Sequence, residues 1–375
     1  MIEKVLHLER KFTSKTETFI VNQINTLENY EPVVACIQNT SNLFCSANII
    51  TPAEKGFLIP DKYLFNNTKN SLYNEIKKIN FKLIHAHYLT DASFFLGLVQ
   101  KLDVPKIVSC YGYDVSSFPN RFGGLGKKII RKVFDYYDKI IAMSDDMKKD
   151  IINLGCDENK IIVHYYGTDT SRFINNDRNY GDREIYNILQ VGTLEEKKAQ
   201  FLVIDSLKLL INKYNKDNII YHVVGEGVHR NYLKSLIKDS DIEGKVKFYG
   251  HVAHNTNELI ELYNKADIFI QPSIVSKGGD KEGIPGTIVE AMASGLPVIS
   301  TYHAGIPYII ENEKEGLLVK ERDVDGLAEA FDKLMTNPEL REKLGRNAQK
   351  KAIEKLSLKN GTEELEEIYK KVISG

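Results

Sequence analysis

The chain lacks long apolar runs, an apolar N-terminal segment and a strong net charge. No stretch approaches the ~20 apolar residues of a membrane-spanning helix. The N-terminal segment carries charged residues where a secretory signal peptide needs an apolar run. A net charge of −1 gives the molecule no strong field to attract nucleic acid. These absences predict a cytoplasmic protein with no nucleic-acid partner.

Cysteine is also scarce. The four cysteines form no C-x-x-C pair, and none lies near a histidine pair at zinc spacing. We therefore expect a reduced protein with no metal site and no cofactor. The cysteines are Cys36, Cys45, Cys110 and Cys156.

What the chain does have is a regular alternation of short apolar runs and longer amphipathic segments along its 375 residues. The apolar runs predict buried strands at 5–8, 33–37, 83–86, 106–109, 139–142 and 161–164. A second series follows at 185–192, 219–225, 246–249, 268–271, 298–300 and 316–319. Strand–helix alternation of this kind predicts an α/β fold with two Rossmann-like, doubly wound parallel-sheet domains and a cleft between them.

The predicted domain limits follow from the polar segment 174–184, which has the composition of a linker. We expect an N-terminal domain at 1–177 and a C-terminal domain at 185–357. The last segment, 358–375, is expected to be an amphipathic helix. Its pattern leaves open which domain it packs on, and packing back on the N-terminal domain is one alternative.

Two glutamates, Glu282 and Glu290, flank the start of a predicted helix after the strand at 268–271. The helix N-terminus near Gly286 and Thr287 presents unpaired N–H groups and the positive end of the helix dipole, which suits a diphosphate. A carboxylate on each side would hold hydroxyl groups, from a sugar and from a ribose. The alternative is that both glutamates are solvated surface charges. The apolar residues around Glu290 favour a buried carboxylate, which needs a partner.

The stretch from Gly279 to Thr301 resembles the E-x7-E signature of the family-4 retaining glycosyltransferases, which have the GT-B fold. The segments Gly305-Ile-Pro and Glu315-Gly-Leu-Leu-Val also match. The resemblance covers nearly the whole chain. It is closest to bacterial enzymes of the colanic-acid type, which build capsule, exopolysaccharide and lipopolysaccharide.

This resemblance implies roles for the residues of the motif. Glu282 would contact the donor sugar as a catalytic residue, and Glu290 would hold the ribose hydroxyls. The backbone of Thr287 and Ile288 would contact the distal phosphate. The sugar hydroxyls would be contacted by the backbone of Gly283, Ile284, Pro285 and Gly286.

Further donor contacts are implied elsewhere in the second half. Lys198 matches the family's phosphate-binding lysine and is the second predicted catalytic residue. Gly192 ends a predicted strand, and Thr193 stands where the family carries an arginine, so Lys197 is expected to substitute for the missing cation. Gly225 resembles the next family loop, for which a tight turn is the alternative. The nucleotide base would be recognised by backbone groups of the loop that contains His251 and Val252.

The N-terminal half holds the acceptor residues that the resemblance implies. Glu17 and Thr18 lie in a segment that resembles the family's Ser-Glu-Thr-Phe, although a helix-capping box explains them equally well. His85 and His87 share one face of a strand. Since no third metal ligand stands at a recognisable spacing, we expect one histidine to pack and His87 to lie near the acceptor.

Two more acceptor-side residues, Tyr111 and Asp114, lie where the family has His-Gly-x-Asp. A tyrosine cannot act as a general base near neutral pH. Retaining transfer by front-face return needs no protein base, so this departure leaves the predicted activity intact.

A basic amphipathic helix is predicted around residue 130. Such a helix can lie on an anionic membrane surface, although a packed helix with a solvated basic face is the alternative. We expect contact with the inner face of the plasma membrane, because lipid-linked acceptors require it. The basic residues are Arg121, Lys127, Lys128, Arg131 and Lys132.

Together these patterns predict a retaining hexosyltransferase that moves a sugar from a nucleotide diphosphate, UDP being favoured, to a lipid-linked or growing glycan acceptor. Two alternatives remain open. A GT-B sugar-nucleotide epimerase would release nucleotide without an acceptor. A non-catalytic sugar-nucleotide or glycan-binding protein would bind the donor without turnover.

Overall fold

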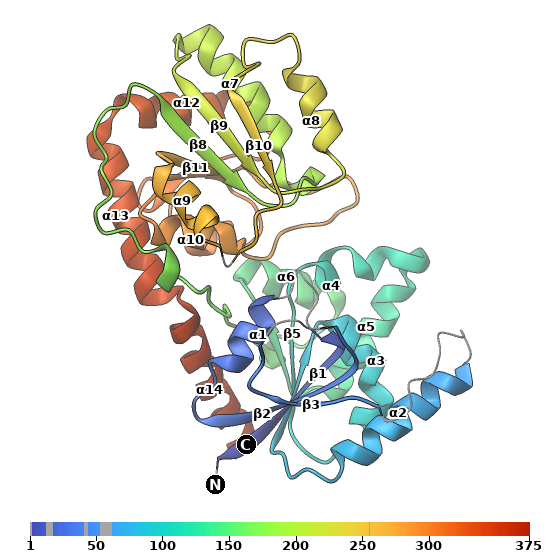
Figure 1. Cartoon of the computed structure of the whole chain (residues 1–375). Helices are drawn as coiled ribbons and strands as arrows, with labels where there is room; N and C mark the ends of the chain where they lie inside the picture. Colours follow the sequence, from blue (N-terminus) through green and yellow to red (C-terminus); the bar gives the residue numbers. More distant parts are fainter. Residues whose placement is uncertain (1, 13–17, 41–43, 53–61, 255) are drawn as a thin grey trace. The chain divides into compact units, whose positions relative to one another are not determined.

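The computed structural model describes residues 2–12, 18–40, 44–52, 62–254 and 256–375. The chain forms two compact units (Figure 1). The first unit comprises Met1–Gly167 together with Leu358–Gly375, and the second comprises Thr168–Ser357. Within the described residues, no helix is both long and apolar enough to cross a bilayer.

The first unit is built on a seven-stranded sheet in the order β3-β2-β1-β4-β5-β6-β7, and all of its strands are parallel. Strand order reverses between β1 and β4, where sheets of this kind place their ligand sites. The strands are β1 (Glu3–Phe12), β2 (Tyr30–Asn39), β3 (Asn48–Ile50), β4 (Leu83–His87), β5 (Lys106–Ser109), β6 (Lys139–Ala142) and β7 (Ile161–Val163).

Helices accompany this sheet in the order expected for a doubly wound fold. Helix α6 shows how local sequence sets their limits, because Ser144 caps its first turn and Gly155 ends it with a φ of 104°. The helices are α1 (Thr18–Asn25), α2 (Lys62–Ile76), α3 (Leu89–Val99), α4 (Tyr113–Ser116), α5 (Leu125–Tyr136), α6 (Asp145–Leu154) and α14 (Leu358–Ser374).

Helix α14, dark red in Figure 1, packs against α1 within the first unit. The Glu366 carboxylate accepts hydrogen bonds from the backbone N–H groups of Glu28 and Asn29, both at 2.7 Å. Tyr369 is fully buried, and its hydroxyl lies 2.6 Å from Nδ1 of His85. The C-terminal segment is therefore an integral part of the first unit.

The second unit has a six-stranded sheet in the order β10-β9-β8-β11-β12-β13, again with all strands parallel. The two units thus repeat one topology. The strands are β8 (Tyr186–Val191), β9 (Ile219–Val224), β10 (Val246–Gly250), β11 (Ile268–Gln271), β12 (Val298–Thr301) and β13 (Gly316–Val319). The helices are α7 (Gln200–Tyr214), α8 (Arg230–Ile237), α9 (Asn257–Lys265), α10 (Gly286–Ala293), α11 (Ile306–Ile309), α12 (Val324–Thr336) and α13 (Pro338–Lys355).

The polar segment 174–184 is packed on the second unit, so its interpretation as a linker is wrong. Arg178 donates to the backbone oxygens of Ser294, Ala266 and Tyr263 at 2.5–2.7 Å. The buried guanidinium of Arg341 binds the Tyr180 carbonyl at 2.8 Å. These arginine–carbonyl hydrogen bonds hold the segment in place, and residues 168–177 belong to the second unit rather than to the first.

Candidate functional site

Helix α10 carries the buried member of the acid pair. Six consecutive residues, from Ile288 to Ala293, are buried, and Glu290 among them is 4 % exposed. Oε1 of Glu290 lies 2.9 Å from Nε2 of His254, and Oε2 accepts from the Tyr263 hydroxyl at 2.7 Å. The carboxylate is therefore buried with partners, as the apolar helix predicts. Each oxygen keeps lone-pair capacity for a further donor such as a ribose hydroxyl.

Sequence reasoning missed both partners of Glu290. Tyr263 lies in α9, and His254 follows β10 in the same loop as the predicted His251 and Val252. The hydrogen bond to Glu290 raises the pKa of His254 above its ordinary value, against the effect of burial. The sequence signal that could have indicated His254 is its position four residues after the carboxyl end of strand β10.

The other acid, Glu282, forms an ion pair with Lys198. Nζ of Lys198 lies 2.9 Å from Oε1 of Glu282, and both side chains are about nine-tenths buried, at 11 % and 10 % exposed. Burial raises the pKa of Glu282, but the ammonium groups of Lys198 and Lys197 outweigh it, so the pKa is lowered overall. The structure thus brings together the two residues predicted to be catalytic.

Lys197 is engaged separately, with its Nζ 2.9 Å from Oδ2 of Asp280 in the glycine-containing loop before α10. Burial alone would lower the pKa of Lys197, and the charges of Glu282 and Asp280 raise it overall. Lys197 and Lys198 stand side by side in sequence, yet they hold two different acids of this loop.

Two glycines, Gly192 and Gly225, follow the neighbouring strands β8 and β9. A Cβ on Gly192 would lie 3.5 Å from the Lys198 stem. Gly225 has a φ of 137°, and a Cβ there would lie 1.9 Å from the Gly192 carbonyl oxygen. Only glycine permits this approach of the loops after β8 and β9. Thr193, beside them, accepts a hydrogen bond from Gln200 through its carbonyl.

A buried histidine, His303, positions the loop that carries Glu282. The Glu282 N–H donates to Nε2 of His303 at 3.1 Å, so Nε2 is unprotonated and Nδ1–H donates to Oε1 of Glu321 at 2.6 Å. Oε2 of Glu321 accepts from the Val275 N–H at 2.9 Å. His303 and Glu321 were not predicted, although both follow strand ends in the predicted sheet.

The glycine of the Gly305-Ile-Pro segment fits closely against the same loop. Its N–H donates to the Gly283 carbonyl at 3.2 Å. A Cβ on Gly305 would lie 2.5 Å from that oxygen and 2.7 Å from Ile284 Cγ1. Ile284 and Pro285 are buried, whereas Gly283, Gly286 and Thr287 are half-buried.

The predicted acceptor residues lie in the first unit. Glu17 is outside the described residues, and Thr18 begins α1. Asp114 is fully buried, and its carboxylate accepts from the N–H groups of Leu89, Tyr111 and Gly112 at 2.9–3.1 Å. Burial raises the pKa of Asp114, although these N–H donors oppose the effect. Asp114 therefore organises the loop after β5.

His87 is also fully buried, and its Nδ1 lies 2.7 Å from the hydroxyl of half-buried Tyr111. Burial raises the pKa of Tyr111 well above its ordinary value. Of this pair, only Tyr111 reaches the surface.

Of the five basic residues predicted to contact a membrane, two form hydrogen bonds within the first unit. Arg131 Nε and Lys127 Nζ donate to the carbonyls of Leu154 and Asn153 at the end of α6. Lys128 and Lys132 are exposed on α5, and the Arg121 guanidinium lies over the Tyr113 ring.

Several known proteins are similar to this chain in sequence, and others are similar to it in fold. Residues 16–172 match the model described as Glycosyltransferase Family 4, and residues 175–351 match Glycosyl transferases group 1. The amylovoran biosynthesis glycosyltransferase AmsK of Erwinia amylovora is 34 % identical over 66 % of this chain and 59 % of its own length. A putative colanic acid biosynthesis glycosyltransferase, WcaL of Escherichia coli, is 33 % identical over 55 % of this chain and 50 % of its own length. The chain thus matches about half of each relative's length.

Solved structures show the same fold over nearly the whole chain. Sucrose-phosphate synthase from Thermosynechococcus elongatus has a TM-score of 0.77 at 17 % identity and covers 99 % of both chains. Anabaena HepE, solved with UDP and glucose, has a TM-score of 0.76 at 17 % identity, covering 98 % of this chain and 99 % of its own. The two sheets confirm the predicted pair of Rossmann-like domains, and these solved structures share that GT-B fold. In sequence, the first part of the chain is similar to Glycosyltransferase Family 4 and the second part to Glycosyl transferases group 1.

Proposed function

We propose that this chain is a retaining glycosyltransferase that moves a hexose-type sugar from a UDP-sugar to a lipid-linked or growing glycan in surface polysaccharide synthesis. The observation that carries the proposal is the buried Lys198–Glu282 ion pair beside the N-terminus of α10. The polysaccharide relatives AmsK and WcaL support the pathway. The presence of UDP in the HepE structures supports the choice of nucleotide.

In this proposal the donor diphosphate competes with Glu282 for Lys198. The ammonium group then stabilises negative charge as the sugar–phosphate bond breaks. Glu282, released from the ion pair, accepts hydrogen bonds from the donor sugar, while the N-terminus of α10 binds phosphate oxygens. Glu290 holds the ribose, and no metal ion takes part in the transfer.

The proton of the acceptor hydroxyl passes to the departing phosphate oxygen. Tyr111 is unsuited to take it, because burial raises its pKa well above the ordinary value. Catalysis then rests on positioning and on electrostatic stabilisation of the leaving group.

The deciding experiment is the variant Lys198→Ala, assayed with UDP-sugars and a lipid-linked acceptor. Removing the cation should lower kcat by about 10²–10³-fold. Lys234→Ala, an exposed lysine in α8 of the same unit, is the control. Full activity of Lys198→Ala would refute the assignment. Acceptor-independent nucleotide release would identify an epimerase, and donor binding without turnover would identify a binding protein.

A thermal-shift panel of UDP-, GDP- and ADP-sugars identifies the nucleotide base of the donor.

We further propose that α5 contacts an anionic membrane surface on the cytoplasmic side. Its outer face combines the exposed basic residues Lys128 and Lys132 with the exposed apolar residues Leu125 and Ile129, which are 52 % and 39 % exposed. This combination favours the boundary between headgroups and acyl chains.

Replacing Arg121, Lys128 and Lys132 with Gln leaves the Arg131 and Lys127 hydrogen bonds intact and should abolish sedimentation with anionic vesicles. Sedimentation equal to that of the unchanged protein would contradict the membrane proposal.

A further inference from the structure

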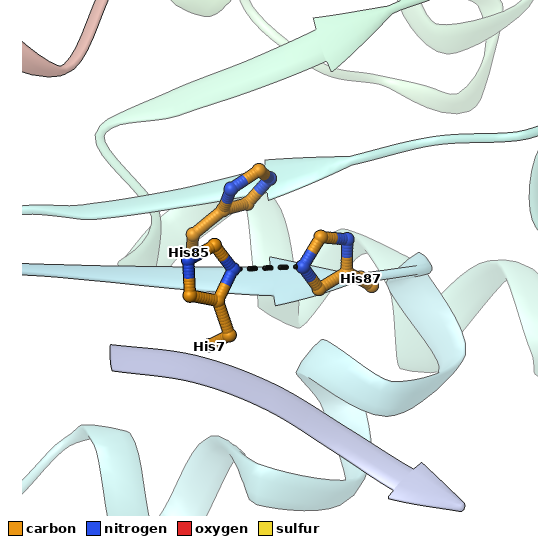
Figure 2. Close-up of side chains that lie close together, drawn as sticks. All are labelled: His7, His85 and His87. Atoms are coloured by element: carbon orange, nitrogen blue, oxygen red, sulfur yellow. Dashed lines mark hydrogen bonds between the residues drawn. The ribbon is translucent and has the colours of Figure 1, made fainter. Parts of the chain in front are cut away.

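Three histidines converge in the sheet of the first unit, whereas Lys198 and Glu282 belong to the second unit. His7 lies on β1, and His85 and His87 lie on the neighbouring strand β4 (Figure 2). The strand register places His7 opposite His85, and strand alternation puts His87 on the same face as His85. All three side chains are fully buried, and one ring nitrogen from each lies within 4.8 Å of the others.

The hydrogen bonds fix how the rings are turned. Nδ1 of His7 lies 3.0 Å from Nε2 of His87, as the dashed line in Figure 2 marks. The other nitrogen of His87 faces the Tyr111 hydroxyl at 2.7 Å. Nδ1 of His85 faces the Tyr369 hydroxyl at 2.6 Å, and its Nε2 lies 2.8 Å from Ser109 Oγ. The Tyr111 hydroxyl therefore orients His87 and leaves its Nε2 toward His7, whereas both nitrogens of His85 have hydroxyl partners.

The protonation state of the cluster suits ligation. Burial lowers the pKa of His7 to about 3. Burial also lowers the pKa values of His85 and His87 well below their ordinary range, and the neighbouring imidazoles lower them further. Burial thus favours the neutral form of all three rings, and a neutral imidazole is the form that binds a metal.

We propose that His7, His85 and His87 form a binding site for Zn²⁺ in the first unit. Zinc lies about 2.0–2.1 Å from histidine nitrogen, so tetrahedral ligands stand roughly 3.3 Å apart. The 3.0 Å between His7 and His87 is close to this spacing, and His85 would supply the third nitrogen by exchanging its contact with Ser109 Oγ for the metal. Imidazole ligands favour zinc over magnesium and calcium, which take oxygen ligands.

Two features outside the three rings support this site. Metal-bound histidines usually donate their second N–H to an oxygen, and Tyr111 and Tyr369 provide such oxygens for His87 and His85. Glu9, 2 % exposed, lies two residues beyond His7 on β1 and so on the same face of the strand. Its carboxylate offsets part of the cost of a buried dication.

The experiment uses the full chain, stripped with a chelator and then dialysed against limiting Zn²⁺. We expect one bound zinc per chain by elemental analysis, and a visible Co²⁺ spectrum of the intense tetrahedral type after cobalt substitution. His7→Gln should lower zinc affinity by more than ~10-fold. His222→Gln, a half-buried histidine of the second unit that hydrogen-bonds to Asn187, is the control and should retain the wild-type affinity.

Because His7→Gln alters the core, a milder pair of variants tests the same site. Tyr369→Phe removes only the hydroxyl that orients His85 and should lower zinc affinity by about 10-fold. Tyr137→Phe removes another fully buried hydroxyl of the same unit, one that has no hydrogen-bond partner among the described residues, and should leave affinity unchanged. The proposal is overturned if the unchanged chain takes up no stoichiometric zinc, or if Tyr369→Phe binds zinc as tightly as Tyr137→Phe.

Discussion

Glu290 is held by two side chains that reach it from other parts of the second unit. Tyr263 lies 27 residues away in sequence and His254 lies 36 residues away. The apolar helix around Glu290 predicts a buried acid, and the structure has one. Its partners could not be predicted, because periodicity reports burial and not which distant loop covers a side chain.

This contact makes the second unit sensitive to pH through His254. The hydrogen bond to Glu290 raises the folded-state pKa of His254, whereas the unfolded value is about 6.5. Stability from the protonated pair is therefore complete below about pH 6.5 and is lost as pH rises through the raised pKa. Asp169 adds to the raised pKa, and Arg172 opposes it.

We expect the loss of unfolding free energy in His254→Ala to be larger at about pH 5.5 than at about pH 8.5. Urea denaturation of wild type and variant at the two pH values measures it. His251→Ala, at an exposed histidine of the same loop, is the control variant. An equal loss of unfolding free energy at both pH values would show that the His254–Glu290 ion pair does not stabilise the second unit.

At the scale of elements, the apolar runs predicted twelve strands within one or two residues of their observed ends in most cases. The three-residue strand β3 was missed, because an edge strand with half-exposed residues has no buried run. Helix α13 was missed because most of its residues are polar. It begins instead at a local signal, the Asn337 side chain, which accepts from the Leu340 N–H at 2.9 Å.

The loop before α10 depends on its fit against α11, and this fit gives a second prediction. In Gly305→Ala the added Cβ would meet the Gly283 carbonyl and Ile284. The loop must shift and carry Glu282 away from Lys198, which should lower kcat by about 10²-fold, the expected cost of a small misplacement.

The control is Gly278→Ala in the same loop, where a Cβ would meet nothing closer than 3.8 Å. Steady-state kinetics with a UDP-sugar compare the two variants. Equal kcat values for both would show that the fit of Gly305 is irrelevant to transfer.

At the scale of the whole molecule, the two parallel-sheet units followed from the sequence. The division of the chain between them did not. Composition marked 174–184 as a linker because its residues are polar. In the structure, Arg178 of this segment donates to the Ser294 carbonyl, and buried Arg341 donates to the Tyr180 carbonyl of the segment. Only three-dimensional contacts distinguish such a packed polar segment from a flexible one.

The attachment of α14 predicts that a change near the C-terminus weakens the first unit alone. Glu366→Ala removes the acceptor for the N–H groups of Glu28 and Asn29 and should destabilise the first unit by about 1–3 kcal/mol. Hydrogen exchange read by mass spectrometry should show lost protection in α1 and β2 and unchanged protection in the strands of the second unit.

Glu367→Ala is the matched control, since the neighbouring Glu367 is exposed and its ion pair with Lys370 is a surface one. Lost protection that spreads equally over both units would contradict the prediction.

Because the first unit is made of Met1–Gly167 and Leu358–Gly375, the second unit is in effect an insertion within it. During synthesis on the ribosome, residues 1–167 emerge first, but Tyr369 and Glu366 are translated only after the whole inserted unit. The second unit can therefore reach its native state while the first still lacks one of its helices. We expect the order of completion during translation to be the reverse of the order along the chain.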